Sequence, residues 1–267
     1  MKAMGRPPPQ AFTALDAFAA RHPDETWETF RDLDNGQQYR ALRQALCDAQ
    51  HGLCAYCEVA VDRPRLDGLR AQIEHVIEKS RSSELGRNLH LDGRNLVLSC
   101  TGGGRMELQP PLYHPPLPEN LSCGQSKELR GKSVQLVDCR DLPLAPPVLL
   151  VDDTGRIVTD PEGCHMARVD ERALDQTVDV LGLRCPRLQS GREDWWIELL
   201  VLSEDLLEAE DADGLAALAR GVLLPDAEGR LSPFWSTSRS FFGTRAEAII
   251  AAEYRQPFEQ NPVSSDR

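Results

Sequence analysis

Three features are scarce or missing in this sequence: long apolar runs, a leader-like N-terminus and excess positive charge. No apolar run reaches about 18 residues, the length of a transmembrane helix, so we expect no membrane contact. The first ten residues, MKAMGRPPPQ, contain no apolar core of a signal peptide, which predicts a cytoplasmic location where thiols stay reduced. We also find no internal repeat. The ordinary apolar content of 41% then indicates a soluble globular protein.

The charge of the chain argues against a simple nucleic-acid binder. The formal net charge is −12, with 30 lysines and arginines against 42 aspartates and glutamates. Residues 61–140 differ from the rest, because they hold 12 basic side chains against 10 acidic ones. Residues 193–213, in contrast, contain nine acidic side chains and no basic one. Any nucleic acid should therefore approach the middle of the chain, since an acidic face repels phosphate.

The hydrophobic pattern predicts a chain of mixed helices and strands. Strands are expected over 70–77 and 95–100, a tight knuckle over 52–58 and a hairpin over 148–158. The proline-rich stretch 109–118 excludes regular structure, and the tail after Pro257 is expected to be disordered. Helical spacing is seen over residues 11–21, 36–50, 166–183, 193–211, 213–221 and 244–254, with a short turn or helix at Trp27 and Phe30.

Eight cysteines in a cytoplasmic chain favour metal ligands or buried thiols over disulfides. Cys54 and Cys57 have the spacing of half a tetrahedral zinc site, and Cys100 and Cys123 are candidates for the other half. Two alternatives stay open: Cys100 is a plain buried thiol, or Cys54 and Cys57 form a redox pair. His51 is a further candidate ligand, and the remaining cysteines are interpreted as core thiols: Cys47, Cys139, Cys164 and Cys185.

Three polar residues lie between the two halves of this zinc pattern. Glu74 and His75 are adjacent in the expected strand IEHVI, and Asn95 precedes the next strand. A carboxylate and an imidazole can hold a divalent cation and activate water for attack on phosphorus. Side chains of adjacent strand residues point to opposite faces, so Glu74 and His75 share one site only if the strand is irregular.

The order of these motifs resembles the HNH endonuclease family, whose catalytic unit is a ββα-metal fold. The matching stretches are CAYC at 54–57, IEHVIEKS at 73–80, NLVLSC at 95–100 and CGQSK at 123–127. A closer resemblance, to HNH proteins of retron and Septu-type anti-phage defence systems, runs from about residue 10 to 245. It rests on HPDETWETF at 22–30, YRALRQAL at 39–46, GLCAYCE at 52–58, VLGLRCPRL at 180–188 and FWSTSRSFFG at 234–243.

The resemblance implies a role for each motif residue. His75 would be the general base, Glu74 the ligand of a catalytic Mg²⁺ or Mn²⁺, and Asn95 the residue that orients His75. Lys127 and Lys79 would bind the nucleic-acid backbone. The structural zinc would be bound by Cys54, Cys57, Cys100 and Cys123.

Two positions depart from the family pattern. Gly124 stands where the family usually has a further metal ligand after the last cysteine, so Gln125, Ser126, His90 or water would have to replace it. If His90 binds, a softer metal such as Zn²⁺ or Ni²⁺ becomes an option. Glu78 stands where a proline is common.

We therefore expect an α+β fold with a zinc-clamped ββα-metal (HNH) core between largely helical extensions. The predicted division is an N-terminal helical arm (1–50), a nuclease core (51–140), a mostly helical region (141–255) and a disordered tail (256–267).

The expected function is metal-dependent hydrolysis of nucleic-acid phosphodiester bonds, with DNA favoured over RNA, as the effector of an anti-phage defence system. The resemblance implies an ABC/SMC-like ATPase subunit as partner, and a retron RNA–DNA hybrid as a further one. The alternative is a catalytically weak, zinc-bound module that binds nucleic acid or a partner. The acidic helix over 193–211 is either a docking face or a helix that packs Trp195 and Trp196 into the core, and the aromatic stretch 234–242 is expected in the core.

Overall fold

The computed structural model describes residues 1–62, 71–103, 118–130 and 136–254. Over these ranges the chain is a mixture of helices and two small antiparallel sheets, as the sequence predicts. The predicted tail over 256–267, and the proline-rich stretch up to residue 117, lie outside the described residues. Within the described part, no helix is both long enough and apolar enough to span a bilayer.

The N-terminal region is a three-helix arm whose aromatic side chains turn inward. Thr26 caps the second helix by accepting a hydrogen bond from the backbone N–H of Thr29 at 3.4 Å. Phe18 and Phe30 are buried, with their ring centroids 5.7 Å apart. The helices of this arm are α1 (Thr13–Arg21), α2 (Trp27–Asp32) and α3 (Gln37–Ala49), and the short 3₁₀ turn Pro9–Phe12 precedes α1.

The centre of the molecule is a pair of antiparallel strands with one helix against it. β1 (Ala71–His75) pairs with β2 (Leu96–Cys100), and α4 (Cys123–Arg130) packs on β2. Every residue of β2 is buried, in keeping with a sequence that is apolar except for Ser99. The buried amide of Gln50 at the end of α3 pairs with both backbone groups of Leu98, at 2.8 and 2.7 Å. The Gln50 side chain therefore makes the two hydrogen bonds to Leu98 that a neighbouring strand would make.

The C-terminal region is mostly helical and carries the second sheet. This sheet pairs β3 (Leu149–Val151) with β4 (Ile157–Thr159), in the predicted hairpin. Glu58, in the knuckle, accepts hydrogen bonds from the backbone N–H and the hydroxyl of Ser236, which ties this region to the centre. The helices are α5 (Pro161–Ala167), α6 (Glu171–Val180), α7 (Pro186–Glu208), α8 (Ala212–Leu223), α9 (Trp235–Phe242) and α10 (Thr244–Glu253).

Two helix predictions in this region need correction. The single helix expected over 166–183 is interrupted at Arg168, whose backbone is left-handed (φ 56°), and α6 restarts with Asp170 as its N-cap. The acidic helix begins at Pro186 rather than near residue 193, because proline suits the first turn of a helix. The aromatic stretch 234–242 lies in the core as predicted, with Trp235 only 1% exposed.

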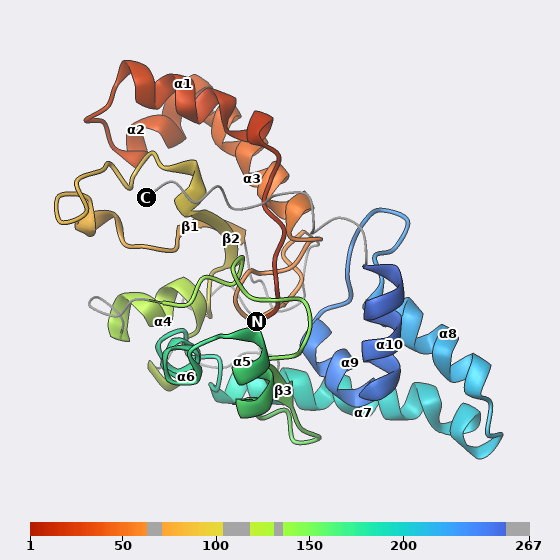
Figure 1. Cartoon of the computed structure of the whole chain (residues 1–267). Coiled ribbons are helices and arrows are strands. Elements are labelled where there is room, and N and C mark those ends of the chain that lie inside the picture. The colour runs from red at the N-terminus through yellow and green to blue at the C-terminus, as the bar shows by residue number, and fades with distance from the viewer. Residues whose placement is uncertain (63–70, 104–117, 131–135, 255–267) are drawn as a thin grey trace.

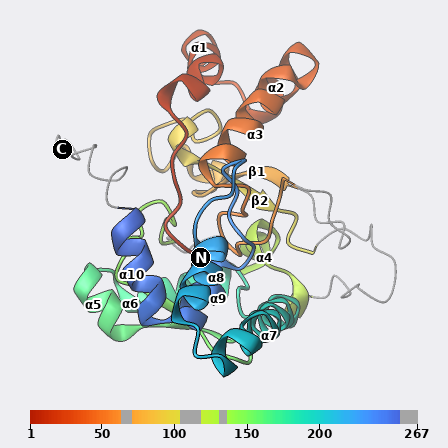
Figure 2. The same ribbon diagram turned by 90° about the vertical axis from the view of Figure 1, so that its right-hand side faces the viewer.

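The two views of the ribbon agree on the arrangement. The N-terminal arm lies at one end, the C-terminal helices lie at the other, and β1, β2 and α4 lie between them (Figures 1 and 2). The first residues of the chain run back from the arm into this centre, where the backbone N–H of Met4 donates to the carbonyl of Cys139 at 3.3 Å. The central unit is thus supported from both sides.

Candidate metal centre and active site

Four cysteines that are far apart in the sequence meet beside the strand pair. The Sγ atoms of Cys54, Cys57, Cys100 and Cys123 all lie within 4.8 Å of one another, and all four residues are buried. The first two come from the knuckle, the third ends β2 and the fourth begins α4. The predicted cluster is therefore confirmed, and it fastens the knuckle, the strand and the helix to one point.

The geometry of the cluster fits a tetrahedral metal ion. Sulfur–sulfur separations are 3.7 Å between Cys54 and Cys123 and 3.6 Å from Cys100 to both Cys57 and Cys123. Four thiolates at about 2.3 Å from a zinc ion would be about 3.8 Å apart. A disulfide would need about 2.05 Å, so these cysteines are not oxidised pairs. The donor set and its spacing therefore suit zinc.

Backbone and hydroxyl groups support the cluster from the side of the protein. The N–H of Cys100 points to the sulfur of Cys54 at 3.3 Å, and the hydroxyl of Ser122 donates to the sulfur of Cys123 at 3.5 Å. Such outer contacts orient metal ligands and stabilise their negative charge. Cys123 also has a positive φ of 56°, an uncommon backbone for a cysteine, which aims its side chain at the other three.

The other candidate ligands are accounted for elsewhere. His51 donates from Nδ1 to the carbonyl of Gly229 at 2.9 Å and takes no part in the four-cysteine cluster. The cysteines interpreted as core thiols are all buried and unoxidised, as predicted: Cys47, Cys139, Cys164 and Cys185.

Arg187 on α7 lies close to the cysteine cluster, a position that no local sequence pattern indicates. Its Nη2 donates to the hydroxyl of Ser122 at 2.6 Å. Burial alone would lower the pKa of Arg187, but the negative charge of the nearby thiols, Cys100 first among them, raises it overall. A tetrathiolate zinc site carries net negative charge, and this guanidinium offsets part of it.

Glu74 points from β1 toward the first turn of α4. Its Oε1 accepts a hydrogen bond from the ammonium of Lys127, which also donates to the backbone carbonyl of His75. Lys127 is only 4% exposed. Burial raises the pKa of the Glu74 carboxyl, while the positive charge of Lys127 opposes that rise. The role predicted for Lys127 needs a solvent-facing ammonium, whereas here the ammonium is buried against Glu74.

Gly124 leaves room for the Glu74 carboxylate. A Cβ atom at Gly124 would lie 2.7 Å from Oε2 of Glu74 and 3.4 Å from the side-chain nitrogen of Gln72. Any larger residue at this position would therefore displace the carboxylate. Glycine at position 124, which departs from the family pattern, is therefore explained by the Glu74 carboxylate, which extends from β1 to this position.

His75 ends β1 on the other side of the sheet. Its ring meets Trp27 of α2 edge to face, with centroids 5.1 Å apart, and the residue is 7% exposed. Nε2 donates to the backbone carbonyl of His90 at 3.1 Å, because a carbonyl can only accept. In the neutral ring the lone pair then lies on Nδ1. Burial lowers the pKa of His75 to about 4, so the ring is neutral near pH 7.

Glu74 and His75 therefore leave β1 on opposite faces. The strand is regular over both residues, with Glu74 paired to Val97 and His75 to Leu96. The irregularity on which a shared site would depend is not present at these two positions. Both residues lie at the end of the strand, where the Lys127 ammonium contacts the Glu74 carboxylate and the His75 backbone carbonyl.

Asn95 clamps the segment that follows His75. Its Oδ1 accepts from the backbone N–H of Ile77 at 2.7 Å, and its Nδ2 donates to the carbonyl of the same residue at 2.8 Å. Its own carbonyl accepts from the N–H of Val76 at 2.8 Å. This is the geometry that the role predicted for Asn95 requires, since three bonds hold the two residues after His75.

The remaining predicted side chains lie near His75. Lys79 donates to Glu28 at 2.6 Å, and both side chains are partly exposed, so a phosphate could replace this weak surface pair. His90 accepts the backbone N–H of Trp27 on Nδ1 at 3.2 Å, which leaves its proton on Nε2 in the neutral form. The sequence predicts only a short turn or helix at Trp27. Its ring contact with His75 has no local sequence signal.

Comparison with known proteins gives the family. No protein-family model matches the chain. A curated protein of Escherichia coli named "Retron Ec83 putative HNH endonuclease" is 31% identical over 195 residues, which cover 66% of this chain and 72% of that protein. The chain belongs to the HNH endonuclease family. The name of the relative assigns that protein to a retron, and its likeness to this chain supports a nuclease function. The four-cysteine cluster agrees with metal binding in that setting.

Proposed function

We propose that this chain is a metal-dependent HNH endonuclease that hydrolyses phosphodiester bonds of DNA. The proposed ββα-metal core is β1, β2 and α4 within residues 51–140, flanked by helical regions over 1–50 and 141–255. Zn²⁺ held by Cys54, Cys57, Cys100 and Cys123 would be its structural ion, which the sulfur spacing of 3.6–3.7 Å supports.

One observation carries the proposal: the fixed tautomer of His75. A general base must be neutral and must present a lone pair at the working pH. The bond from Nε2 to the His90 carbonyl assigns the lone pair to Nδ1, and the ring is neutral near pH 7, although a pKa of about 4 makes it a weaker base than a free histidine. The Asn95 clamp holds the backbone after this ring.

Glu74 is the proposed ligand of the catalytic cation. A protein needs to supply only one or two carboxylates to Mg²⁺, because water and the substrate phosphate complete its shell. Oε2 of Glu74 lies beside Gly124, at the N-terminal turn of α4. When bound there, Mg²⁺ or Mn²⁺ would neutralise charge on the scissile phosphate and on the departing 3′-oxygen.

The proposed reaction takes place at the end of β1. Because Glu74 and His75 leave β1 on opposite faces, the end of the strand would have to rearrange before one phosphate could contact both side chains. His75 takes the proton of the attacking water on Nδ1, Asn95 keeps the ring in place, and Lys79 exchanges Glu28 for a phosphate oxygen. Lys127 holds the Glu74 carboxylate in position.

The acidic charge of the chain supports dependence on a partner. With a net charge of −12, the isolated chain attracts nucleic acid weakly, which suits a nuclease that must be controlled in its host. We propose that it acts in anti-phage defence with an ABC/SMC-like ATPase, together with a retron RNA–DNA hybrid.

α7 is the proposed docking face for that ATPase. Trp195 and Trp196 pack inward, through a 2.8 Å bond to Ser238 and a ring contact with Phe241. α7 also exposes apolar side chains among acidic neighbours: Ile197, Leu200, Val201, Leu202 and Leu207. Exposed apolar side chains among acidic ones fit a partner whose surface is apolar with a basic border.

A second candidate function rests on the burial of the same site. His75 is 7% exposed and Lys127 already neutralises Glu74, an arrangement that would also suit a zinc-stabilised module that binds nucleic acid without cutting it. The two candidates differ in one property, which is turnover.

The test is cleavage of plasmid DNA and of RNA by the purified chain, alone and with its partner ATPase, with Mg²⁺ or Mn²⁺. The proposal predicts cleavage that chelation of the divalent cation abolishes, and Glu74→Gln should reduce the rate at least about 100-fold. Glu84→Gln is the matched control, because Glu84 is an exposed carboxylate paired to Arg81 in the same region. Binding without cleavage under every condition would favour the second candidate.

A further inference from the structure

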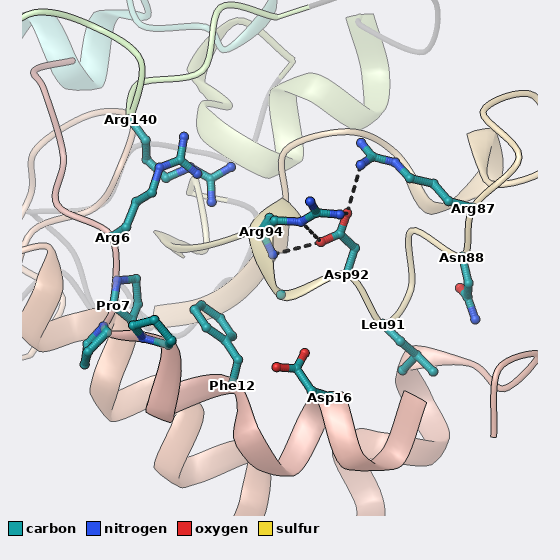
Figure 3. Close-up of a pocket in the computed structure, with 13 residues that line it drawn as sticks. Arg6, Pro7, Phe12, Asp16, Arg87, Asn88, Leu91, Asp92, Arg94 and Arg140 are labelled. Carbon is teal, nitrogen blue, oxygen red and sulfur yellow. Dashed lines mark hydrogen bonds and ion pairs between the residues drawn. The ribbon is translucent and has the colours of Figure 1, made fainter. Parts of the chain in front are cut away.

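A pocket of about 770 Å³ lies between the N-terminal arm and the loop that precedes β2. Figure 3 shows the Phe12 ring and the Asp16 carboxylate on one side, with Arg6, Arg94 and Arg140 across from them. The walls come from three stretches that are far apart in the sequence: residues 6–16, residues 87–94 and Arg140. None of the side chains that line the pocket is used in the chemistry proposed above.

The lining of the pocket is rich in arginine. Four arginines line it, against two carboxylates, those of Asp16 and Asp92. Arg6 and Arg140 each pair with a further carboxylate that is not part of the lining, Asp141 and Asp138. The pocket therefore gathers guanidinium groups on a protein with a net charge of −12. Local positive charge on an acidic chain concentrates anions at one place instead of over the whole surface.

Donors of Arg6, Arg87 and Arg94 are available to a ligand, whereas all three nitrogens of Arg140 already bond Asp138 or the Leu96 carbonyl. Arg6 contacts Asp141 through Nη2 at 2.7 Å, and Arg87 contacts Asp92 through Nη1 at 3.2 Å, while each guanidinium has five N–H donors. Arg94 also pairs with Asp92, yet its side chain is 80% exposed. Surface pairs of this kind are worth about 0–1 kcal/mol, so a phosphate can share or replace them. The forked guanidinium suits the oxygens of a phosphate.

The floor of the pocket is apolar and fixed. A Cβ atom at Gly93 would lie 2.5 Å from the Phe12 ring, so the ring rests directly on the backbone of this loop. Leu91 and the prolines at 7–9 complete the apolar surface. An aromatic ring beside arginines is a platform on which an unpaired base stacks. A base inside a duplex is already stacked on its neighbours, so the platform favours a single strand.

The pocket shares a loop with the candidate active site. The 87–94 loop that lines it also carries His90, whose carbonyl receives the His75 bond. Arg140 donates to the carbonyl of Leu96 at 3.0 Å, and Leu96 is the residue paired with His75 in the sheet. A strand held here would therefore continue toward the end of β1.

We propose that this pocket binds a nucleotide of a single-stranded nucleic acid, with its phosphate on Arg6, Arg87 and Arg94 and its base on Phe12. This inference rests on the proposed nuclease function, since it names where the substrate is held beside the cleavage site. The amino group of a base can donate to Asp16, as cytosine and adenine amino groups donate to acidic and amide side chains elsewhere.

Binding without added divalent cation tests this assignment separately from cleavage. The probe is a fluorescent single strand of about 12 nucleotides, as DNA and as RNA, titrated with the full chain over a range of salt concentrations. Arg87→Gln/Arg94→Gln removes two of the three proposed contacts to one phosphate. The salt slope should fall by about 0.7, which corresponds to about fivefold weaker binding near 0.1 M salt.

Matched variants separate the pocket from general charge. Arg172→Gln/Arg220→Gln makes the same change in net charge on exposed arginines of α6 and α8, and should leave binding unchanged. Arg87→Lys/Arg94→Lys keeps the charges and should keep the salt slope, which also controls for folding. Phe12→Leu keeps the apolar contact with Gly93 but removes the ring, and should weaken binding about tenfold.

The outcomes distinguish this inference from the proposed function. Absence of cleavage with pocket-dependent binding would refute the nuclease and leave the pocket in place. Glutamine variants that bind as tightly as the α6/α8 control would overturn the pocket assignment. Binding of free nucleoside monophosphate but not of the strand would also overturn it, in favour of a free-nucleotide site.

Discussion

Replacing Asn95 with alanine should destabilise the protein measurably and reduce cleavage even more. The substitution removes the two bonds to Ile77, at 2.7 and 2.8 Å, from a side chain that is only 3% exposed. Each such bond contributes about 1 kcal/mol net, so the expected loss is about 2 kcal/mol in the free energy of unfolding. For a chain of this size, that corresponds to a fall of about 4–8 °C in Tm.

The effect on catalysis should exceed the effect on folding. Without the clamp, the segment after His75 is free to shift, and a misplacement of about 1 Å can cost about 100-fold in rate. Thr177→Val is the matched control, because the buried Thr177 hydroxyl bonds the backbone of Ala173 and Val137, neither of which has a role in the proposed site. That variant should lose similar stability without a specific loss of activity.

The assay is thermal unfolding combined with single-turnover cleavage below the Tm of the weakest variant. Asn95→Asp adds a further point, because it keeps the acceptor for the Ile77 N–H but turns a carboxylate toward the Ile77 carbonyl. It should be no more active than the alanine variant. Unchanged Tm and unchanged rate in Asn95→Ala would refute the clamp, and a rate that fell only as much as in Thr177→Val would reduce it to a structural contact.

Three further predictions follow from the metal centre and the residues around it. Metal analysis should find about one zinc per chain, lost in Cys57→Ser and retained in Cys139→Ser, whose thiol lies outside the cluster; equal zinc content in both variants would contradict the site. Gly124→Ala should reduce cleavage with little change in Tm because its Cβ displaces the adjacent carboxylate, whereas Gly221→Ala, which meets nothing within 4 Å, should leave the rate unchanged. Burial alone would raise the pKa of Asp138, but hydrogen bonds from Arg140 lower it overall. The ionised carboxylate therefore stabilises the folded protein above the unfolded pKa of about 3.9, and this contribution is lost as pH falls through the folded pKa. Chemical unfolding of Asp138→Asn should therefore show a deficit of about 2 kcal/mol at pH 7 that shrinks below about pH 4, and a deficit that is constant with pH would contradict this.

The cysteine cluster was predictable because its signals are local. The C-x-x-C knuckle, the strand that ends in Cys100 and the helix that begins at Cys123 can each be recognised from a short stretch. A metal ion then needs only their ends to meet. The strand that contains Glu74 and His75 was predictable for the same reason.

Contacts between distant segments were not predictable. Lys127 was expected at the surface, and only the packing of α4 beside β1 buries its ammonium against Glu74. Trp27 covers His75 because α2 and the strand end come together, which no periodicity indicates. The arginine pocket likewise joins three stretches separated by up to about 130 residues.

Among the helix boundaries, the start of α7 could be predicted from the sequence and the break at Arg168 could not. Pro186 is a recognisable first-turn residue, so the start of α7 could have been found from the sequence. The break at Arg168 has no glycine or proline to signal it, although Asp170 has the character of an N-cap. Tertiary packing of α5 and α6 decides that break.

The most direct test of the central claim is the cleavage rate of His75→Ala, measured with the divalent cation and the partner ATPase present. If His75 is the general base, the rate should fall about 10²- to 10⁴-fold, while zinc content and Tm show that the fold is retained. His165→Ala, which changes an exposed histidine on α5, should cleave at the wild-type rate. Wild-type cleavage by His75→Ala would contradict the proposed active site.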